Sequence, residues 1–188
     1  MRNPLIVLTG AVLAAAVTAG CTGTDPGKTA APRAVPSPTP TYELPPRPVR
    51  PGEIPVRAAP VTDGETRFQV IGLQKGLDGF FGSHAEWRAK GQYVVVRVVV
   101  ENLARTTAHF DAKRQKLVAA DGTSHAPNKF AQAIKRQPDT LSLGAQVRVE
   151  MDLWYDIPEE AKVSAIRLFG DPPLGVTGGT DGAQVPLP

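Results

Sequence analysis

The sequence lacks several features by which small domains are often recognised. It has a single cysteine, Cys21, among 188 residues, and aromatic residues make up only 6% of the chain. One cysteine excludes an intramolecular disulfide, so no disulfide framework holds this fold together. An unpaired cysteine in an exported chain would need a specific reason, and its position after an apolar run supplies one below.

Motifs for catalysis and for cofactor binding are also missing. There is no Gly-x-Ser-x-Gly elbow, no glycine loop that would cradle a phosphate, and no histidine pair at metal-ligand spacing. The adjacent residues of Ser83-His84 and of Ser124-His125 point to opposite faces of an extended segment, so neither pair is a ready dyad. We therefore predict a protein without enzymatic activity, with no catalytic residue, no cofactor and no metal.

The folded part of the chain has no excess of either charge. The formal net charge of +3 comes from Arg2 and from residues 22–61, because residues 62–188 contain fifteen basic and fifteen acidic side chains. Nucleic-acid binding requires a basic face that neutralises phosphates. The balance therefore argues against a nucleic-acid partner, although a local basic patch can exist within a neutral total.

No apolar run is long enough to span a membrane comfortably. Residues 4–19 are apolar or small and follow Arg2, but a transmembrane helix needs about 20 apolar residues. A short positive segment followed by such a run is typical of a signal peptide. We predict that residues 1–20 are a signal peptide and, without a twin arginine, that it uses the general secretion route.

The end of this run, Thr18-Ala19-Gly20-Cys21, resembles the lipobox of bacterial lipoproteins. The resemblance implies cleavage before Cys21 and transfer of a diacylglycerol to its thiol. Two or more acyl chains anchor a protein stably, at about 0.8 kcal/mol per buried CH₂. The predicted location is the extracytoplasmic face of the cell membrane; the alternative is a cleaved secretory signal with an incidental cysteine.

Residues 21–61 are predicted to form a disordered linker. Eleven of the nineteen prolines lie between residues 22 and 60, and proline cannot donate a hydrogen bond to a helix or a sheet. Such a segment favours polyproline-II structure. We interpret it as a stalk that lifts a domain away from the membrane; the alternative is a ligand for a proline-recognition module.

Residues 62–188 show the alternating pattern of short strands. Val94, Val96, Val98 and Val100 share one face of the strongest predicted strand, whose other face carries Arg97 and is predicted to be partly solvated. Residues 128–136 are predicted to form a helical turn capped by Asn128, with Phe130, Ala133 and Ile134 on one face. Glycines make residues 77–91 look like a long loop. Strands are predicted at residues 67–73, 92–102, 115–120, 146–156, 163–169 and 184–187.

Six or seven short strands with almost no helix predict an all-β fold, an antiparallel Ig-like β-sandwich. Gly91-Gln-Tyr93, the valine strand, Asp121-Gly122, Leu143-Gly144 and Leu153-Trp-Tyr155-Asp156-Ile-Pro158 together resemble an Ig-like domain of unknown function. That domain occurs in Gram-positive lipoproteins and in the mycobacterial immunoprotective extracellular protein family. The resemblance covers residues 62–188 and implies a fold, but it implies no catalytic residue.

Two features indicate a binding surface. Trp154 falls on the polar face of its strand by alternation, and an exposed tryptophan often marks a contact surface. Phe80, Phe81 and Trp87 lie in the predicted glycine-flanked loop, and loops at the ends of sandwiches commonly bind ligands. The alternatives are that other residues cover Trp154 and that the loop aromatics close the core.

The sequence therefore predicts a membrane-anchored envelope lipoprotein that presents a non-catalytic Ig-like interaction module. Its expected partners are the membrane, through lipid on Cys21, and an envelope protein or cell-wall component. Two alternatives remain open. One is a small metal-assisted hydrolase that uses His84, His109 and His125, and the other is a carrier of an apolar ligand inside the sandwich.

Overall fold

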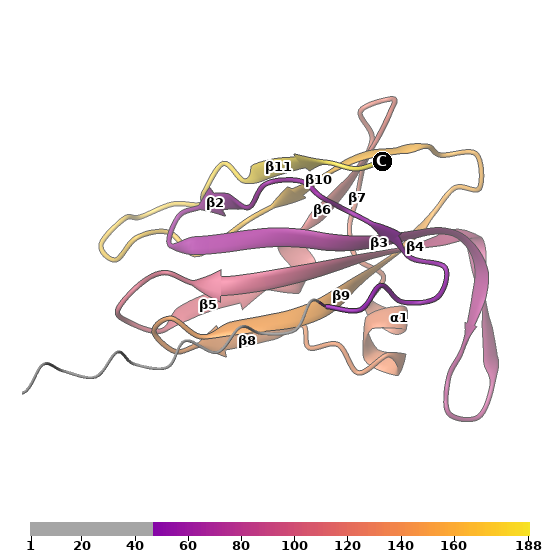
Figure 1. Ribbon diagram of the computed structural model, residues 1–188, viewed down its shortest axis with the longest axis horizontal. Coiled ribbons are helices and arrows are strands. Elements are labelled where there is room, and N and C mark those ends of the chain that lie inside the picture. Colours follow the sequence, from indigo (N-terminus) through magenta and orange to yellow (C-terminus); the bar gives the residue numbers. More distant parts are fainter. Residues whose placement is uncertain (1–46) are drawn as a thin grey trace, which may run out of the picture. The chain divides into compact units, whose positions relative to one another are not determined.

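The computed structural model describes residues 47–188. The predicted signal peptide, Cys21 and residues 21–46 of the predicted linker lie outside the described residues. Two antiparallel layers enclose the core of the described domain (Figure 1), which confirms the prediction of an all-β sandwich. Within residues 47–188, no helix is long and apolar enough to cross a membrane.

The first sheet is built around a long hairpin. Its strands run in the order β1-β3-β4-β9, and β2 pairs with the start of β3. The neighbouring strands are all antiparallel. The strands are β1 (Ile54–Pro55), β2 (Val61–Asp63), β3 (Thr66–Phe81), β4 (Glu86–Asn102) and β9 (Arg148–Ile157).

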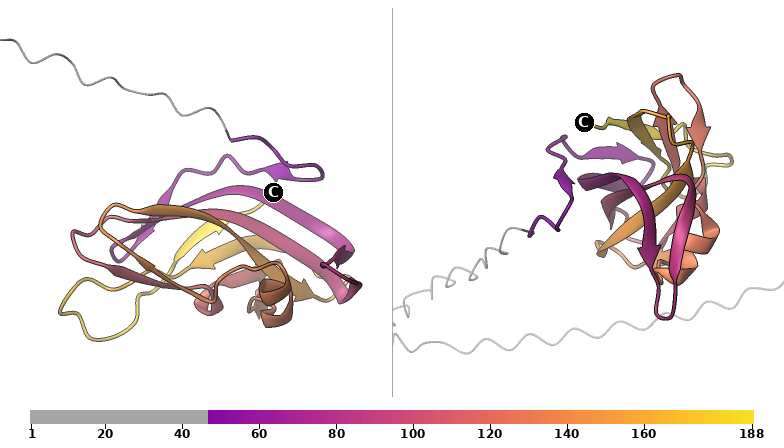
Figure 2. Two further views of the ribbon diagram at one scale, coloured as in Figure 1. Left: turned by 90° about the horizontal axis from the view of Figure 1, so that it is seen from below. Right: turned by 90° about the vertical axis from the view of Figure 1, so that its right-hand side faces the viewer.

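The second layer is assembled from shorter strands in the order β11-β10-β6-β7, with a separate pair formed by β5 and β8. These strands are β5 (Ala108–Asp111), β6 (Lys116–Ala119), β7 (Ser124–His125), β8 (Thr140–Leu143), β10 (Val163–Leu168) and β11 (Ala183–Pro186). A 3₁₀ turn, η1 (Ala112–Arg114), follows β5, and the short helix α1 (Lys129–Ile134) lies between β7 and β8. Figure 2 shows the two layers from the side and from one end.

Alternation along the central strands builds the main core. The even-numbered valines of β4 are fully buried, as predicted, and they face apolar residues of the second layer such as Leu117 and Ile166. Burial of one such side chain stabilises the fold by roughly 1.5–3 kcal/mol. Tyr155 lies in the same core, and burial raises the pKa of its phenol well above its usual value.

The prediction of a long loop at residues 77–91 is wrong for most of these residues. β3 continues to Phe81 and β4 starts at Glu86, so these residues form the outer part of a hairpin whose register shifts between Gln74 and Gly79. The glycines that suggested a loop instead permit close strand approach. A Cβ atom on Gly79 would lie 2.8 Å from the carbonyl oxygen of Trp87.

The predicted domain boundary at residue 62 is also wrong. Residues 47–61 pack on the first sheet, and β1 pairs with Gly72 and Leu73 of β3. Prolines do not prevent this packing, because an added edge strand needs few backbone donors. We call residues 47–56 the N-terminal strap.

Arg97 holds the strap, and the prediction that its face is partly solvated is wrong at this position. The residue is only 5% exposed although it lies in the middle of β4. Its guanidinium donates to the carboxylates of Glu53 at 2.7 Å and Glu150 at 3.1 Å, and to the carbonyl oxygen of Pro48 at 3.1 Å. Gly72 makes room for this pair, because a Cβ atom there would overlap the Glu53 carboxylate.

Substitution Glu53→Ala should lower the free energy of unfolding by about 3 kcal/mol, because it leaves Arg97 buried without its nearest counter-charge. The matched control is Glu101→Ala, which breaks the more exposed pair with Arg67 and should cost less than about 1 kcal/mol. Urea unfolding of residues 22–188 measures both values. Equal losses in the two variants would contradict a specific role for the buried pair.

Candidate interaction surface

The outer half of the β3–β4 hairpin bends away from the sandwich toward the side where α1 lies (Figures 1 and 2). A second, smaller hydrophobic cluster forms on this outer face of the first sheet. Leu77, Ala89 and Ile134 pack around it. Its buried members are Phe80, Tyr93, Val95, Ala131 and Trp154.

Trp154 and Phe80 are therefore not exposed, and their predicted places on an open binding surface are wrong. Trp154 is 7% exposed and Phe80 is 6% exposed, with ring centroids 5.1 Å apart in an edge-on arrangement. Alternation placed Trp154 correctly on the outer face of β9. It could not show that the hairpin and α1 cover that face. Burial raises the pKa of the neighbouring Tyr93, and the charge of Asp156 adds to this shift.

Lys135 fastens the hairpin to the helix. Its ammonium group lies 4.8 Å from the Phe80 ring centroid and 5.2 Å from that of Trp154. It also donates a hydrogen bond to the carbonyl oxygen of Phe81 at 3.0 Å. A cation over aromatic faces contributes about 0.5–2 kcal/mol, so this contact supports the bent position of the hairpin.

Two glutamine side chains, one on helix α1 and one just after it, cover the free edge of β9. The Gln132 side chain accepts a hydrogen bond from the backbone N–H of Trp154, and that of Gln137 accepts one from Asp152, both at 2.9 Å. Asn128 caps the helix as predicted, accepting from the Ala131 N–H at 2.9 Å. An uncovered edge strand would invite pairing with another chain, so α1 closes this edge.

Three aromatic side chains remain exposed where the hairpin end meets α1. Phe81 is 75% exposed, Phe130 is 46% exposed and Trp87 is 39% exposed. Trp87 and Phe130 contact each other edge-on, with centroids 4.7 Å apart. We call Phe81, Trp87 and Phe130 the aromatic tip.

Sequence reasoning named two residues of the aromatic tip as binding candidates and did not name the third. Phe81 and Trp87 were both predicted binding residues. Phe130 was predicted only to share one face of the helix with Ala133 and Ile134; it is exposed, and Ala131 and Gln132 are the buried residues of α1. A six-residue helix is too short for its periodicity to reveal which side faces the sheet.

The two chain segments that carry the aromatic tip contain more basic than acidic residues. Residues 127–138, which contain α1, have no acidic side chain, and Asp78 and Glu86 are the acidic residues of the outer hairpin between residues 75 and 90. The basic side chains of these two segments are Lys75, Arg88, Lys90, Lys129, Lys135 and Arg136. These two segments therefore carry six basic and two acidic side chains, although the charge of residues 62–188 is balanced.

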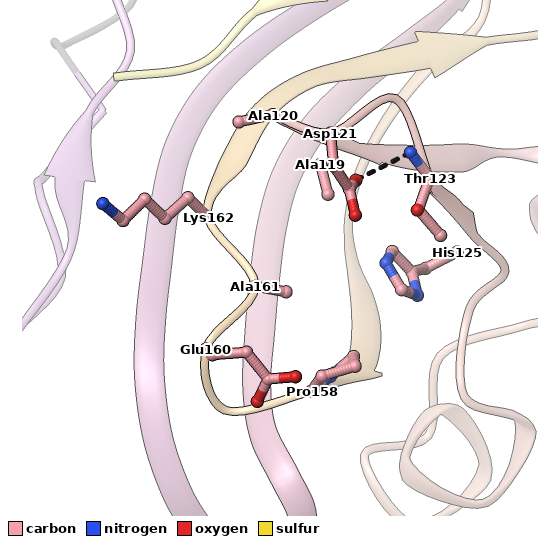
Figure 3. A pocket seen from close by; sticks show the side chains of 9 residues that line it. All are labelled: Ala119, Ala120, Asp121, Thr123, His125, Pro158, Glu160, Ala161 and Lys162. Atoms are coloured by element: carbon pink, nitrogen blue, oxygen red, sulfur yellow. Dashed lines mark hydrogen bonds between the residues drawn. The ribbon is translucent and has the colours of Figure 1, made fainter.

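A separate pocket of about 300 Å³ lies where the β6–β7 turn meets the β9–β10 loop (Figure 3). His125, Asp121 and Thr123 lie across it from Glu160, and the side chain of Lys162, which also lines the pocket, points away from them. The Thr123 N–H donates to the Asp121 carboxylate at 2.8 Å, and this hydrogen bond lowers the pKa of Asp121. Asp121-Gly122 forms the predicted turn, with Gly122 at a φ of 86°.

The three histidines proposed for a hydrolase lie on different elements. His84 is in the turn of the β3–β4 hairpin, His109 is on β5 and His125 is on β7. His109 contacts the hydroxyl of Ser142 at 3.3 Å. Within residues 47–188, no group of three or more His, Cys, Asp or Glu side chains is arranged to hold a metal ion.

Comparison with known proteins identifies the family but not an activity. Residues 59–178 match the family described as “Domain of unknown function (DUF4352)”. The chain belongs to this family. The DUF4352 match includes the complete β3–β4 hairpin and α1, whereas the whole N-terminal strap, which contains β1, and β11 lie outside it.

Among solved structures, the yjhA protein from Bacillus subtilis is similar to the chain, with a TM-score of 0.46 and 19% sequence identity. The alignment covers 64% of this chain and 83% of that protein. None of the curated proteins matches the chain.

The two tryptophans should respond differently to substitution. Trp154→Ala removes a buried ring from the second cluster and should lower the free energy of unfolding by about 4 kcal/mol. Trp87→Ala removes a partly exposed ring and should cost about 1 kcal/mol. Thermal and urea unfolding of the two variants check this, and a small effect of Trp154→Ala would contradict the packing described here.

Proposed function

We propose that the protein is a lipid-anchored envelope protein whose DUF4352 domain binds another envelope component without catalysing a reaction. Three sequence features support the anchor: the apolar run of residues 4–19, the lipobox-like residues that end at Cys21, and the proline-rich segment that follows. In this proposal the domain lies outside the cell at the end of a stalk. The resemblance to the mycobacterial immunoprotective extracellular protein family supports an exported domain of this kind.

The observation that carries the binding proposal is the aromatic tip. Large aromatic side chains at the end of a projecting hairpin cost solubility and add little to the core. Phe81, at 75% exposure, makes the smallest contribution to packing of the three. Exposed aromatic groups of this kind mark contact surfaces, where they bury a large area with few flexible bonds.

Substitution Cys21→Ser should release the protein from the membrane fraction of cells that express it, because the acyl chains would have no sulfur to join. The measurement is fractionation followed by detection of the domain in membrane and soluble fractions. Ala19→Ser, which keeps both a small residue and the thiol, is the control and should leave the protein in the membrane. A Cys21→Ser protein that still sediments with membranes would contradict the anchor.

Envelope binding is tested with residues 22–188 immobilised and exposed to detergent-solubilised envelopes. Phe81→Ser should reduce the recovery of any retained component about tenfold, because it removes an aromatic contact group. Leu174→Ser is a suitable control, since Leu174 is 86% exposed in the β10–β11 loop. Equal recovery by both variants would place the contact surface elsewhere.

A further inference from the structure

We propose that the aromatic tip and its basic surroundings dock onto the surface of an anionic lipid bilayer, with Phe81 and Trp87 entering the interface. The inference rests on the proposed function, in which the aromatic tip is a contact surface, and it names the component that this surface contacts. Three observations carry it: the shape of the tip, its charge, and the place where the chain enters the domain.

The shape of the tip suits a bilayer better than a pocketed partner. Phe81 and Trp87 flank the turn of the β3–β4 hairpin, and the outer part of this hairpin extends past the body of the sandwich (Figure 2). A convex apolar end can enter the interfacial region of a bilayer without any matching cavity. Tryptophan is enriched at this depth, where its ring is partly apolar and its N–H is hydrated.

The charge around the tip favours an anionic surface. Arg88 and Lys90 follow Trp87 on β4, and Lys129 precedes Phe130 on α1. Each Lys or Arg close to an anionic membrane strengthens binding about fivefold. The balance of charge in residues 62–188 means that the remaining surface carries no such excess, so electrostatic attraction would orient the tip toward the lipid.

The N-terminal strap enters the domain beside this same surface. The Asp152 carboxylate pairs with Arg50 of the strap at 2.7 Å, and the backbone N–H of the same residue bonds the Gln137 side chain just after α1. The strap and α1 therefore cover neighbouring parts of one face of the first sheet. The described residues therefore begin, at Arg47 paired with Glu150, on the same face of the first sheet that the hairpin and α1 cover.

The length of the tether permits this docking. Cys21 and Arg47 are separated by about 26 residues, which span at most about 80 Å when extended at 3.1 Å per residue. A lipid anchor at the far end would hold the tip at a high effective concentration near the bilayer. At this effective concentration, even weak binding of the aromatic tip to the bilayer would orient the domain.

The test uses residues 22–188, which keep the whole described domain and exclude the apolar run and Cys21. The probes are vesicles of phosphatidylglycerol and phosphatidylcholine in equal amounts, and vesicles of phosphatidylcholine alone. Of the two tryptophans in the sequence, Trp154 is buried and Trp87 is partly exposed. A blue shift of the emission on addition of anionic vesicles therefore reports on Trp87.

We expect co-sedimentation and the blue shift with the anionic vesicles, both weakened by added salt because salt screens surface charge. Phe81→Ser should weaken binding about tenfold through its lost apolar area. Lys129→Glu should weaken it at least fivefold. Leu174→Ser and Arg105→Glu, which change exposed residues beyond the opposite end of β4, are the matched controls and should bind as the unchanged chain does.

No binding to anionic vesicles, equal binding to neutral vesicles, or equal binding by all four variants would overturn the inference. If vesicle binding is absent while Phe81→Ser still loses an envelope component, that component is a protein or a wall polymer and the proposed function stands. If Phe81→Ser changes neither measurement, the aromatic tip is not a contact surface and the proposed function fails with the inference.

Discussion

The structure depends on one buried ion pair on the outer face of the first sheet. Arg97 lies on the outer face of the central strand β4, which would contact solvent if nothing covered it. The strap buries this guanidinium, and burying it without a counter-charge would destabilise the fold. Glu53 supplies the counter-charge at 2.7 Å, and this contact recruits residues 47–56 as a strap over the sheet. Gly72 on the neighbouring strand leaves the space that the carboxylate occupies. The pair thus fixes the position of the first described residues on this sheet.

The first sheet also carries apolar clusters on both of its faces, whereas antiparallel sheets commonly have one face in contact with solvent. The inner cluster joins the two layers of the sandwich. The outer cluster, around Trp154 and Tyr93, exists because the outer half of the long hairpin bends toward α1, which packs against the edge of β9. This second cluster supports the exposed aromatic tip from below. Because this support already orders the aromatic side chains, less conformational entropy is lost when they bind a partner.

Strand positions were predictable wherever one face meets the main core. Alternation located the valines of β4, the apolar residues of β9 and those of β10, because period-two burial leaves a direct mark on the sequence. The hairpin between residues 77 and 91 was not predictable in this way. Its glycines and register shifts interrupt the alternation of buried and exposed residues. What holds it together is the pairing of β3 with β4, which the sequence of either strand alone does not reveal. The contacts of Phe130 and Lys135 at the candidate surface were unpredictable for a similar reason. The sequence of a short helix does not show which of its sides packs on the sheet and which stays exposed.

The sequence by itself determined the all-β class, the polar cap of α1 and the presence of aromatic residues near 80–87, because these follow from local periodicity and side-chain chemistry. It also supports a lipid anchor at Cys21 through a short motif that needs no fold to be recognised. Only the tertiary structure decided that Trp154 and Phe80 are buried while Phe81, Trp87 and Phe130 are exposed. The physical reason is that a strand's second face is buried or free according to what packs over it, and here residues far away in the sequence provide that cover.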